Sequence, residues 1–198
     1  MYEYRKLTPE ERQKLVAERL AKGYPPHKPP HPLPDYDYYL LTATCFEHAH
    51  RMNTAVRRQQ LLDRVFEVMI PAGIEIRAWV VLPNHYHLLV LLLQFSALPE
   101  LFRLIHGRLS FIWNGEDKTR GRQNWYRFTD RAIRSERHYQ TTLNYIHYNP
   151  VKHGVASSPY DWTESSVHWY RENFGRDWLR DMWQTHPVRD YGKGWDNL

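Results

Sequence analysis

The sequence contains very little cysteine and no long hydrophobic run. Its single cysteine, Cys45, excludes intrachain disulfides and any metal cluster built from several thiolates. No apolar stretch approaches the roughly 20 residues that a membrane-spanning helix needs. The first residues, Met1–Lys6, are not followed by the apolar segment of a secretory signal. These absences predict a cytoplasmic protein that has no membrane partner.

Lysine is also scarce relative to arginine. The 198 residues include 20 Arg but 7 Lys, and the formal net charge is +5. Arginine binds phosphate through paired hydrogen bonds and stacks on bases, so this bias favours a nucleic-acid partner. Eight Trp, fourteen Tyr and seven Phe offer further stacking surfaces, although most of these rings are needed for the core.

The spacing of the apolar residues predicts an α+β fold. Alternating or continuous apolar runs predict strands, and apolar residues three or four positions apart predict helices. The expected strands are 38–46, 75–82, 85–93 and 125–133, and the expected helices are 55–70, 99–113 and a third from Ser135 to Pro150. The order β-α-β-β-α-β plus a further helix is the ferredoxin-like pattern, an antiparallel sheet with helices on one face. Pro150 is expected to end or kink the third helix.

Two segments are expected to flank this central domain. In residues 1–35, Thr8 and Glu11 form the N-cap and capping-box positions of a helix that should stop at Gly23. The six prolines of Tyr24–Pro34 then predict an extended strap. The central domain should cover 36–155. The segment 156–198 is rich in Trp and Tyr but weakly periodic, so we expect a packed, irregular extension.

A pair of histidines follows the Pro83-Asn84 turn. His85 and His87 are two residues apart in a predicted strand, so both side chains leave the same face, about 7 Å apart along the chain. Two imidazoles at this spacing can share a metal ion. They can equally be ordinary half-buried histidines, and the pair formed by His48 and His50 has the same spacing.

The third predicted helix offers groups that would complete such a site. Tyr145 and Asn149 are four residues apart and share a helical face. An amide oxygen is a ligand for hard divalent ions, and a phenol is a possible nucleophile toward phosphorus. Beside the histidines they would suit metal-assisted cleavage of a phosphodiester. The residues alone leave several alternatives open. Asn149 can be a helix-ending residue. Tyr139 and Tyr148 are rival nucleophiles, and His147 and His153 are rival ligands.

Two motifs resemble a known family. The segment Leu82–Leu89 resembles the His-hydrophobic-His motif of single-tyrosine HUH endonucleases, with Tyr86 where relatives often have an aliphatic residue. Tyr145–Gly154 is similar to a motif of the REP-associated tyrosine transposases. The Ala-Ile-Arg segment within Arg131–Arg134 lies where that family carries one, and Thr8–Glu11 and Asp161–Ser166 are also similar. The resemblance covers roughly residues 1–170.

The resemblance implies an HUH endonuclease fold with a catalytic helix and a defined set of site residues. His85, His87 and Asn149 would bind Mg²⁺ or Mn²⁺, and Tyr145 would be the nucleophile. It leaves His48 and His50 at the end of a strand without a catalytic role. Two-tyrosine relatives carry their second nucleophile four residues away, whereas Tyr148 is three away, so we expect one nucleophile.

The resemblance also implies a substrate. This is single-stranded DNA folded as the hairpin of a repetitive extragenic palindrome (REP) with an adjacent tetranucleotide, which would be nicked and rejoined through a 5′-phosphotyrosine. Basic residues suited to contact its phosphates are Arg103, Arg108, Lys118, Arg120, Arg122, Arg127, Arg131, Arg134, Arg137 and Lys152. We expect a monomer, although HUH transposases include dimers. The alternatives are a catalytically silent hairpin-binding protein and a metal phosphoesterase that activates water.

Overall fold

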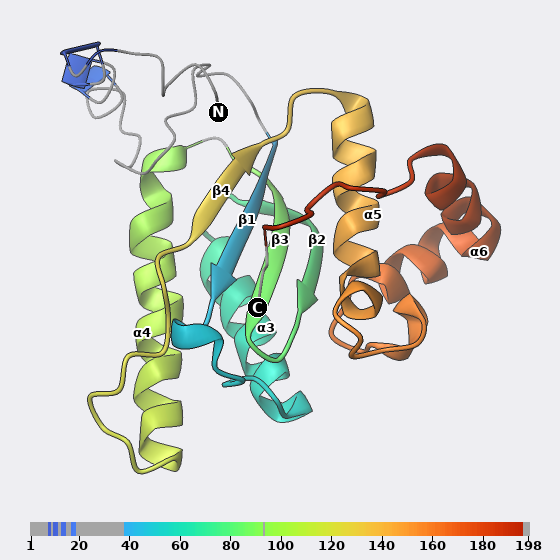
Figure 1. Cartoon of the computed structure of the whole chain (residues 1–198). Helices are drawn as coiled ribbons and strands as arrows, with labels where there is room; N and C mark the ends of the chain where they lie inside the picture. The colour runs from blue at the N-terminus through green and yellow to red at the C-terminus, as the bar shows by residue number, and fades with distance from the viewer. Residues whose placement is uncertain are drawn as a thin grey trace.

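The computed structural model describes residues 38–92 and 94–195, together with seven residues near the N-terminus: Thr8, Glu10, Glu11, Gln13, Lys14, Ala17 and Glu18. Four strands form an antiparallel sheet in the order β2-β3-β1-β4 (Figure 1). They are β1 (Tyr38–Thr44), β2 (Glu75–Val81), β3 (His85–Leu91) and β4 (Thr129–Ala132), and the α-helices of this part are α3 (Ala55–Met69), α4 (Leu98–Glu116), α5 (Glu136–Lys152) and α6 (Val167–Thr185). The α+β class and the ferredoxin-like order are confirmed.

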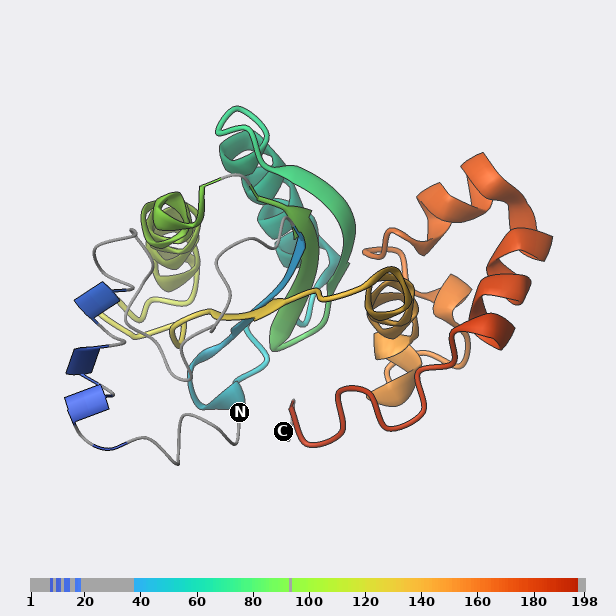
Figure 2. The ribbon, with the colours of Figure 1, turned by 90° about the horizontal axis from the view of Figure 1, so that it is seen from above.

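The helices form two layers on opposite faces of the sheet. Viewed from above, α3 and α4 lie on one side and α5 with α6 on the other (Figure 2). Each layer closes its own hydrophobic core, so the sheet is covered on both faces. Among the described residues, no helix is long and apolar enough to cross a bilayer.

The central strand β3 divides its side chains between the two cores. Tyr86 and Leu88 pack in the core under α3 and α4, whereas Leu89 packs in the core under α5. The period of two in a strand therefore turns His85 and His87 toward α5. Tyr86 packs in the core as an aliphatic residue would, and its hydroxyl lies 2.8 Å from His106 Nε2.

The fourth strand is shorter than the sequence predicts. Thr42 of β1 pairs with Thr129, and Cys45 pairs with Trp125 in an isolated bridge. Between these two pairs, the first segment has two residues (43–44) and the opposite segment has three (126–128). The extra residue interrupts the ladder as a β-bulge does. The prediction of a continuous strand over 125–133 is therefore wrong, although its position beside β1 is confirmed.

Helix α5 passes through Pro150. Ser135 caps it, because its side chain accepts a hydrogen bond from the His138 N–H. The helix continues to Lys152 with Pro150 inside it, so of the two predicted outcomes, an end or a kink at this proline, the end is wrong. A proline removes one hydrogen-bond donor from a helix. The turn still closes, because the His153 N–H donates to the Asn149 carbonyl at 3.1 Å.

The C-terminal extension is packed, as predicted, but it is not irregular. It contains the 19-residue helix α6, which is interrupted at Gly175, where φ is 86°. This break divides the apolar pattern into two short halves. Asn144 of α5 donates a hydrogen bond to the Met182 carbonyl of α6 at 2.8 Å.

Residues before α6 cover the outer edge of the sheet. The Val81 N–H donates to the Glu164 carbonyl at 3.0 Å, and the Ser166 N–H donates to the Trp79 carbonyl at 2.9 Å. The Glu164 carboxylate is buried and lies 2.9 Å from Nε of Arg58 in α3. This stretch of the extension is therefore joined to β2 and to α3.

Only the start of the N-terminal segment can be compared with its prediction. Thr8 Oγ1 accepts a hydrogen bond from the Glu11 N–H at 3.2 Å, and Glu11 Oε2 accepts one from the Thr8 N–H at 2.7 Å. The predicted capping box is confirmed. The predicted stop at Gly23 and the strap Tyr24–Pro34 lie outside the described residues.

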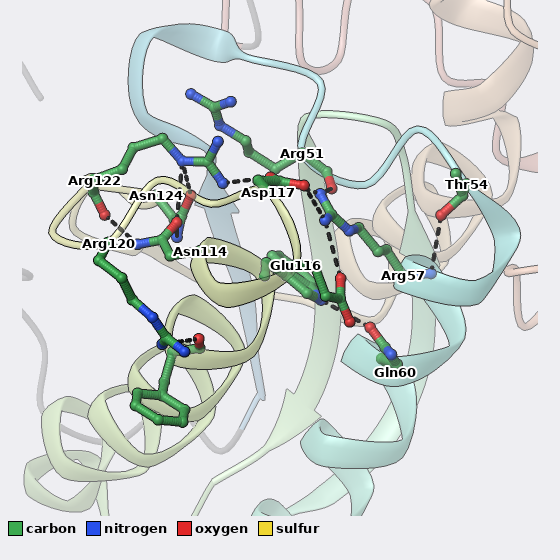
Figure 3. A network of polar contacts seen from close by, with 12 residues as sticks. Arg51, Thr54, Arg57, Gln60, Asn114, Glu116, Asp117, Arg120, Arg122 and Asn124 are labelled. Carbon is green, nitrogen blue, oxygen red and sulfur yellow. Dashed lines mark hydrogen bonds and ion pairs between the residues drawn. The ribbon is translucent and has the colours of Figure 1, made fainter.

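Asp117 ties the loop after α4 to the body of the domain (Figure 3). Its carboxylate accepts hydrogen bonds from Arg57 of α3 at 3.2 Å and from Arg122 at 2.7 Å. These two guanidinium groups, Arg57 first, lower the pKa of Asp117 from 3.8 to about 2. The loop is thus fixed by an ion-pair network that needs an ionised carboxylate.

The Asp117→Asn variant should therefore lose stability in a pH-dependent way. Because the folded-state pKa is depressed, Asp117 contributes its full stability above pH 3.8 and loses it as the pH falls toward about 2. Urea unfolding of the variant and the parent should differ at near-neutral pH and converge in acid. Asp63→Asn, which removes a carboxylate bonded to the Gln59 amide, is the control. A difference that persists in acid would contradict this assignment.

Candidate active site

Four predicted site residues meet between β3 and α5. His85 Nε2 lies 3.2 Å from Asn149 Oδ1, and His87 Nε2 lies 3.4 Å from Tyr145 Oη. The two imidazole centroids are 5.0 Å apart. All four side chains are buried, with at most 1% of each exposed. The continuation of α5 beyond Asn149 allows Tyr145 and Asn149 to face the strand together.

The opposite nitrogens of the two histidines are held by neighbouring side chains. His87 Nδ1 lies 2.7 Å from Thr42 Oγ1 on β1, and His85 Nδ1 lies 2.8 Å from Asn84 Oδ1. The amide oxygen of Asn84 can only accept, so Nδ1 of His85 carries the proton. This leaves the lone pair of His85 on Nε2, which faces Asn149. A hydrogen-bond acceptor at Nδ1, such as Asn84 Oδ1, commonly fixes the tautomer of a metal-binding histidine.

The donor set suits a hard divalent ion. The set comprises two imidazole nitrogens and one amide oxygen, with His85 Nε2 and Asn149 Oδ1 3.2 Å apart and the His87 ring centroid 5.0 Å from that of His85. The Asn149 Nδ2 group is buried and has no hydrogen-bond partner among the described residues. Those residues contain no group of three His, Cys, Asp or Glu side chains that could bind a metal, so the third ligand would be this amide.

The rival residues differ in where they lie. His147 Nε2 lies 3.0 Å from Ser166 Oγ, and burial, followed by the nearby His168, lowers the pKa of His147 to about 3. His147 therefore serves the contact between α5 and the extension. Tyr148 is 44% exposed, and His50 is exposed after β1. His48 is also exposed, in the 3₁₀ turn after β1.

Two other rivals have defined neighbours. His153 is close to the site, because its ring centroid lies 4.9 Å from that of His85. Tyr139 packs edge-on against Tyr38 at 5.0 Å, and burial raises its pKa above the ordinary value. An activated nucleophile has the opposite property.

A C-terminal segment covers Tyr145. In the covering segment Tyr191–Trp195, the rings of Tyr191 and Trp195 lie 5.5 and 5.8 Å from the Tyr145 ring. Lys152 Nζ lies 3.4 Å from Tyr145 Oη and donates to the Gly192 carbonyl at 3.0 Å. Tyr145 is 1% exposed beneath this segment. Sequence reasoning missed this cover, although two glycines between aromatic residues were a signal of close packing.

The basic residues predicted to bind DNA are distributed over α4, the residues between α4 and β4, β4 itself and the start of α5, with Lys152 at the far end of α5. Three of them have partners within the protein: Arg103 pairs with Glu100, Arg122 pairs with Asp117, and Arg120 lies 4.4 Å above the Phe111 ring. Arg131 lies 3.5 Å above the Trp195 ring, so it joins β4 to the covering segment. Five others are exposed: Arg108, Lys118, Arg127, Arg134 and Arg137.

Comparison with known proteins identifies the family. No family model matches the chain. The chain is 33% identical over 157 residues to the REP-associated tyrosine transposase of Escherichia coli K12, an alignment covering 73% of this chain and 90% of that protein. This chain belongs to the REP-associated tyrosine transposases.

Two further proteins are similar to this transposase. A putative REP-associated tyrosine transposase of Haemophilus influenzae is 33% identical over 98 residues, which are 44% of this chain and 56% of that protein. A solved structure of the REP-associated tyrosine transposase bound to a REP hairpin superposes with a TM-score of 0.60 at 25% identity. It covers 73% of this chain and 86% of that chain, which supports the fold described above.

Gly192 offers a test of the covering segment. A Cβ at this position would lie 2.2 Å from Tyr145 Cε2, and φ is +78°. The Gly192→Ala variant should lose about 1 kcal/mol from the left-handed backbone and a further 1–3 kcal/mol, roughly, from overpacking. Thermal unfolding measures the sum, and limited proteolysis measures whether the segment detaches.

Gly73→Ala is the matched control. Gly73 also has a positive φ, +77°, but a Cβ there would meet no atom within 4 Å. The control should therefore show the backbone cost alone. Equal losses in both variants, with no new cleavage near residues 187–195, would show that Gly192 does not pack on Tyr145 as described.

Proposed function

We propose that this transposase nicks and rejoins single-stranded DNA beside REP-type hairpins through covalent attachment to Tyr145. The observation that carries the proposal is the position of Tyr145 Oη, 3.4 Å from Nε2 of His87 in a site that also contains His85 and Asn149. The similar solved protein bound to a REP hairpin supports the choice of DNA.

The reaction is a transesterification at one phosphate. The Tyr145 oxygen attacks phosphorus, the new O–P bond forms, and the bond from phosphorus to the 3′ oxygen breaks. The products are a 5′-phosphotyrosine and a free 3′-hydroxyl, which can attack in reverse and rejoin the strands. Nε2 of His85 and His87 and Oδ1 of Asn149 would bind Mg²⁺ or Mn²⁺, which polarises the scissile phosphate when bound.

The remaining parts of the proposal concern binding and assembly. The exposed arginines on α4, on either side of β4 and at the start of α5 would contact hairpin phosphates, so affinity should fall steeply with salt. The proposed active form is a monomer.

The nucleophile is tested with the Tyr145→Phe variant. A REP-type hairpin oligonucleotide with unpaired flanks and a fluorescent 3′ end is incubated with protein and Mn²⁺, and the adduct is resolved by denaturing electrophoresis. The wild-type chain should form a labelled adduct and the variant none, because phenylalanine has no hydroxyl. Cleavage without an adduct by the variant would indicate a phosphoesterase that activates water. Binding without cleavage by the wild-type chain would indicate a silent hairpin-binding protein.

The metal site is tested with His87→Ala. Loss of one imidazole ligand should lower the adduct-forming rate by at least about 10²-fold. The dissociation constant for the hairpin should change little, because His87 is 0% exposed whereas the predicted phosphate contacts are made by surface residues. His50→Ala removes an exposed imidazole outside the site and should leave the rate unchanged. The metal assignment fails if His87→Ala, still folded by thermal unfolding, reacts at the parent rate.

A further inference from the structure

Lys152 lies beside the proposed nucleophile, Tyr145. It lies seven residues after Tyr145, so Tyr145, Asn149 and Lys152 follow one face of α5 at the i, i+4 and i+7 positions. Its Nζ atom lies 3.4 Å from Tyr145 Oη and 4.8 Å from the centre of the Tyr145 ring. His87 approaches the same hydroxyl from β3.

We infer that Lys152 is a catalytic residue whose ammonium group stabilises the negative charge at the reacting phosphate and the Tyr145 oxygen. This inference rests on the proposed function, since it concerns the same cleavage step. In that step the phenol loses a proton to solvent, the Oη–P bond forms, and the departing 3′ oxygen gains a proton from solvent. Lys152 keeps its protons throughout and acts as a fixed cation and hydrogen-bond donor, and such groups are among the largest contributors to catalysis.

The geometry favours this role over two simpler ones. Lys152 is exposed, as Arg137 is on the same helix, but its Nζ atom lies 3.4 Å from the Tyr145 hydroxyl, which a residue that only binds DNA would not require. A residue that only anchors the covering segment would contact Gly192, which Lys152 also does at 3.0 Å. Removing a pure anchor would uncover Tyr145 and speed cleavage, so the direction of the rate change separates the two roles.

The experiment compares Lys152→Met with Lys152→Arg and Lys193→Met. The rate of adduct formation is measured with the hairpin oligonucleotide and Mn²⁺ at hairpin concentrations far above the dissociation constant, which is measured separately. Lys152→Met should form adduct about 10²–10³-fold more slowly at saturation. Lys152→Arg retains the charge and should react within roughly tenfold of the wild-type rate. Lys193→Met removes an exposed lysine of the covering segment, paired with Asp190, and should react at the wild-type rate.

Four outcomes would overturn the catalytic role of Lys152. If excess hairpin restores Lys152→Met to the wild-type rate, Lys152 only binds DNA; if the variant is faster than wild type, Lys152 is an anchor, and either result overturns the inference. A Lys152→Arg variant as slow as Lys152→Met, with a thermal unfolding midpoint lowered equally, would indicate a structural role and also overturns it. An absence of adduct with the wild-type chain would overturn the proposed function, and this inference with it.

Discussion

Two imidazoles buried on one face of a central strand need polar partners from within the protein, and much of the structure meets that requirement. Thr42 and Asn84 hold the Nδ1 atoms, and the Tyr145 hydroxyl lies beside Nε2 of His87. A buried polar group without a partner costs roughly 1–3 kcal/mol. The adjoining β1 strand and the facing helix α5 are therefore held in register with β3 by the same groups that form the candidate site. The contacts of His85 and His87 therefore contribute both to the stability of the fold and to the geometry of the candidate site.

Much of this arrangement could be predicted from sequence because it depends on short-range periodicity. The alternation in β3 placed His85 and His87 on one face, and helical spacing placed Tyr145 and Asn149 together. The break in β4 could not be predicted, because it depends on a pairing with Cys45 that only the folded chain creates. The predicted helix end at Pro150 was wrong because a proline in the last turn removes a single donor there, and packing on the strands holds the helix.

The C-terminal segment was the least predictable part for a different reason. Gly175 interrupts α6, so neither half of the helix shows enough turns for its apolar face to be recognised. The covering segment has no regular structure, and its position depends on a close approach of Gly192 to the Tyr145 ring. Such a contact joins residues far apart in the chain. Local patterns carry no information on it, apart from the glycines that make it sterically possible.

The buried pair between Arg58 and Glu164 has a consequence for the order of folding. Arg58 belongs to the first helix of the domain, while Glu164 follows all four strands. Trp162 of the same stretch lies 4.5 Å from the Arg58 guanidinium, so Arg58 is covered and paired in one step. While the chain is being synthesised from its N-terminus, Arg58 has no carboxylate until residue 164 has left the ribosome. The sheet and its helices therefore reach full stability only after Tyr145 and Asn149 have also emerged, so the nascent chain completes its fold and its candidate site at nearly the same moment.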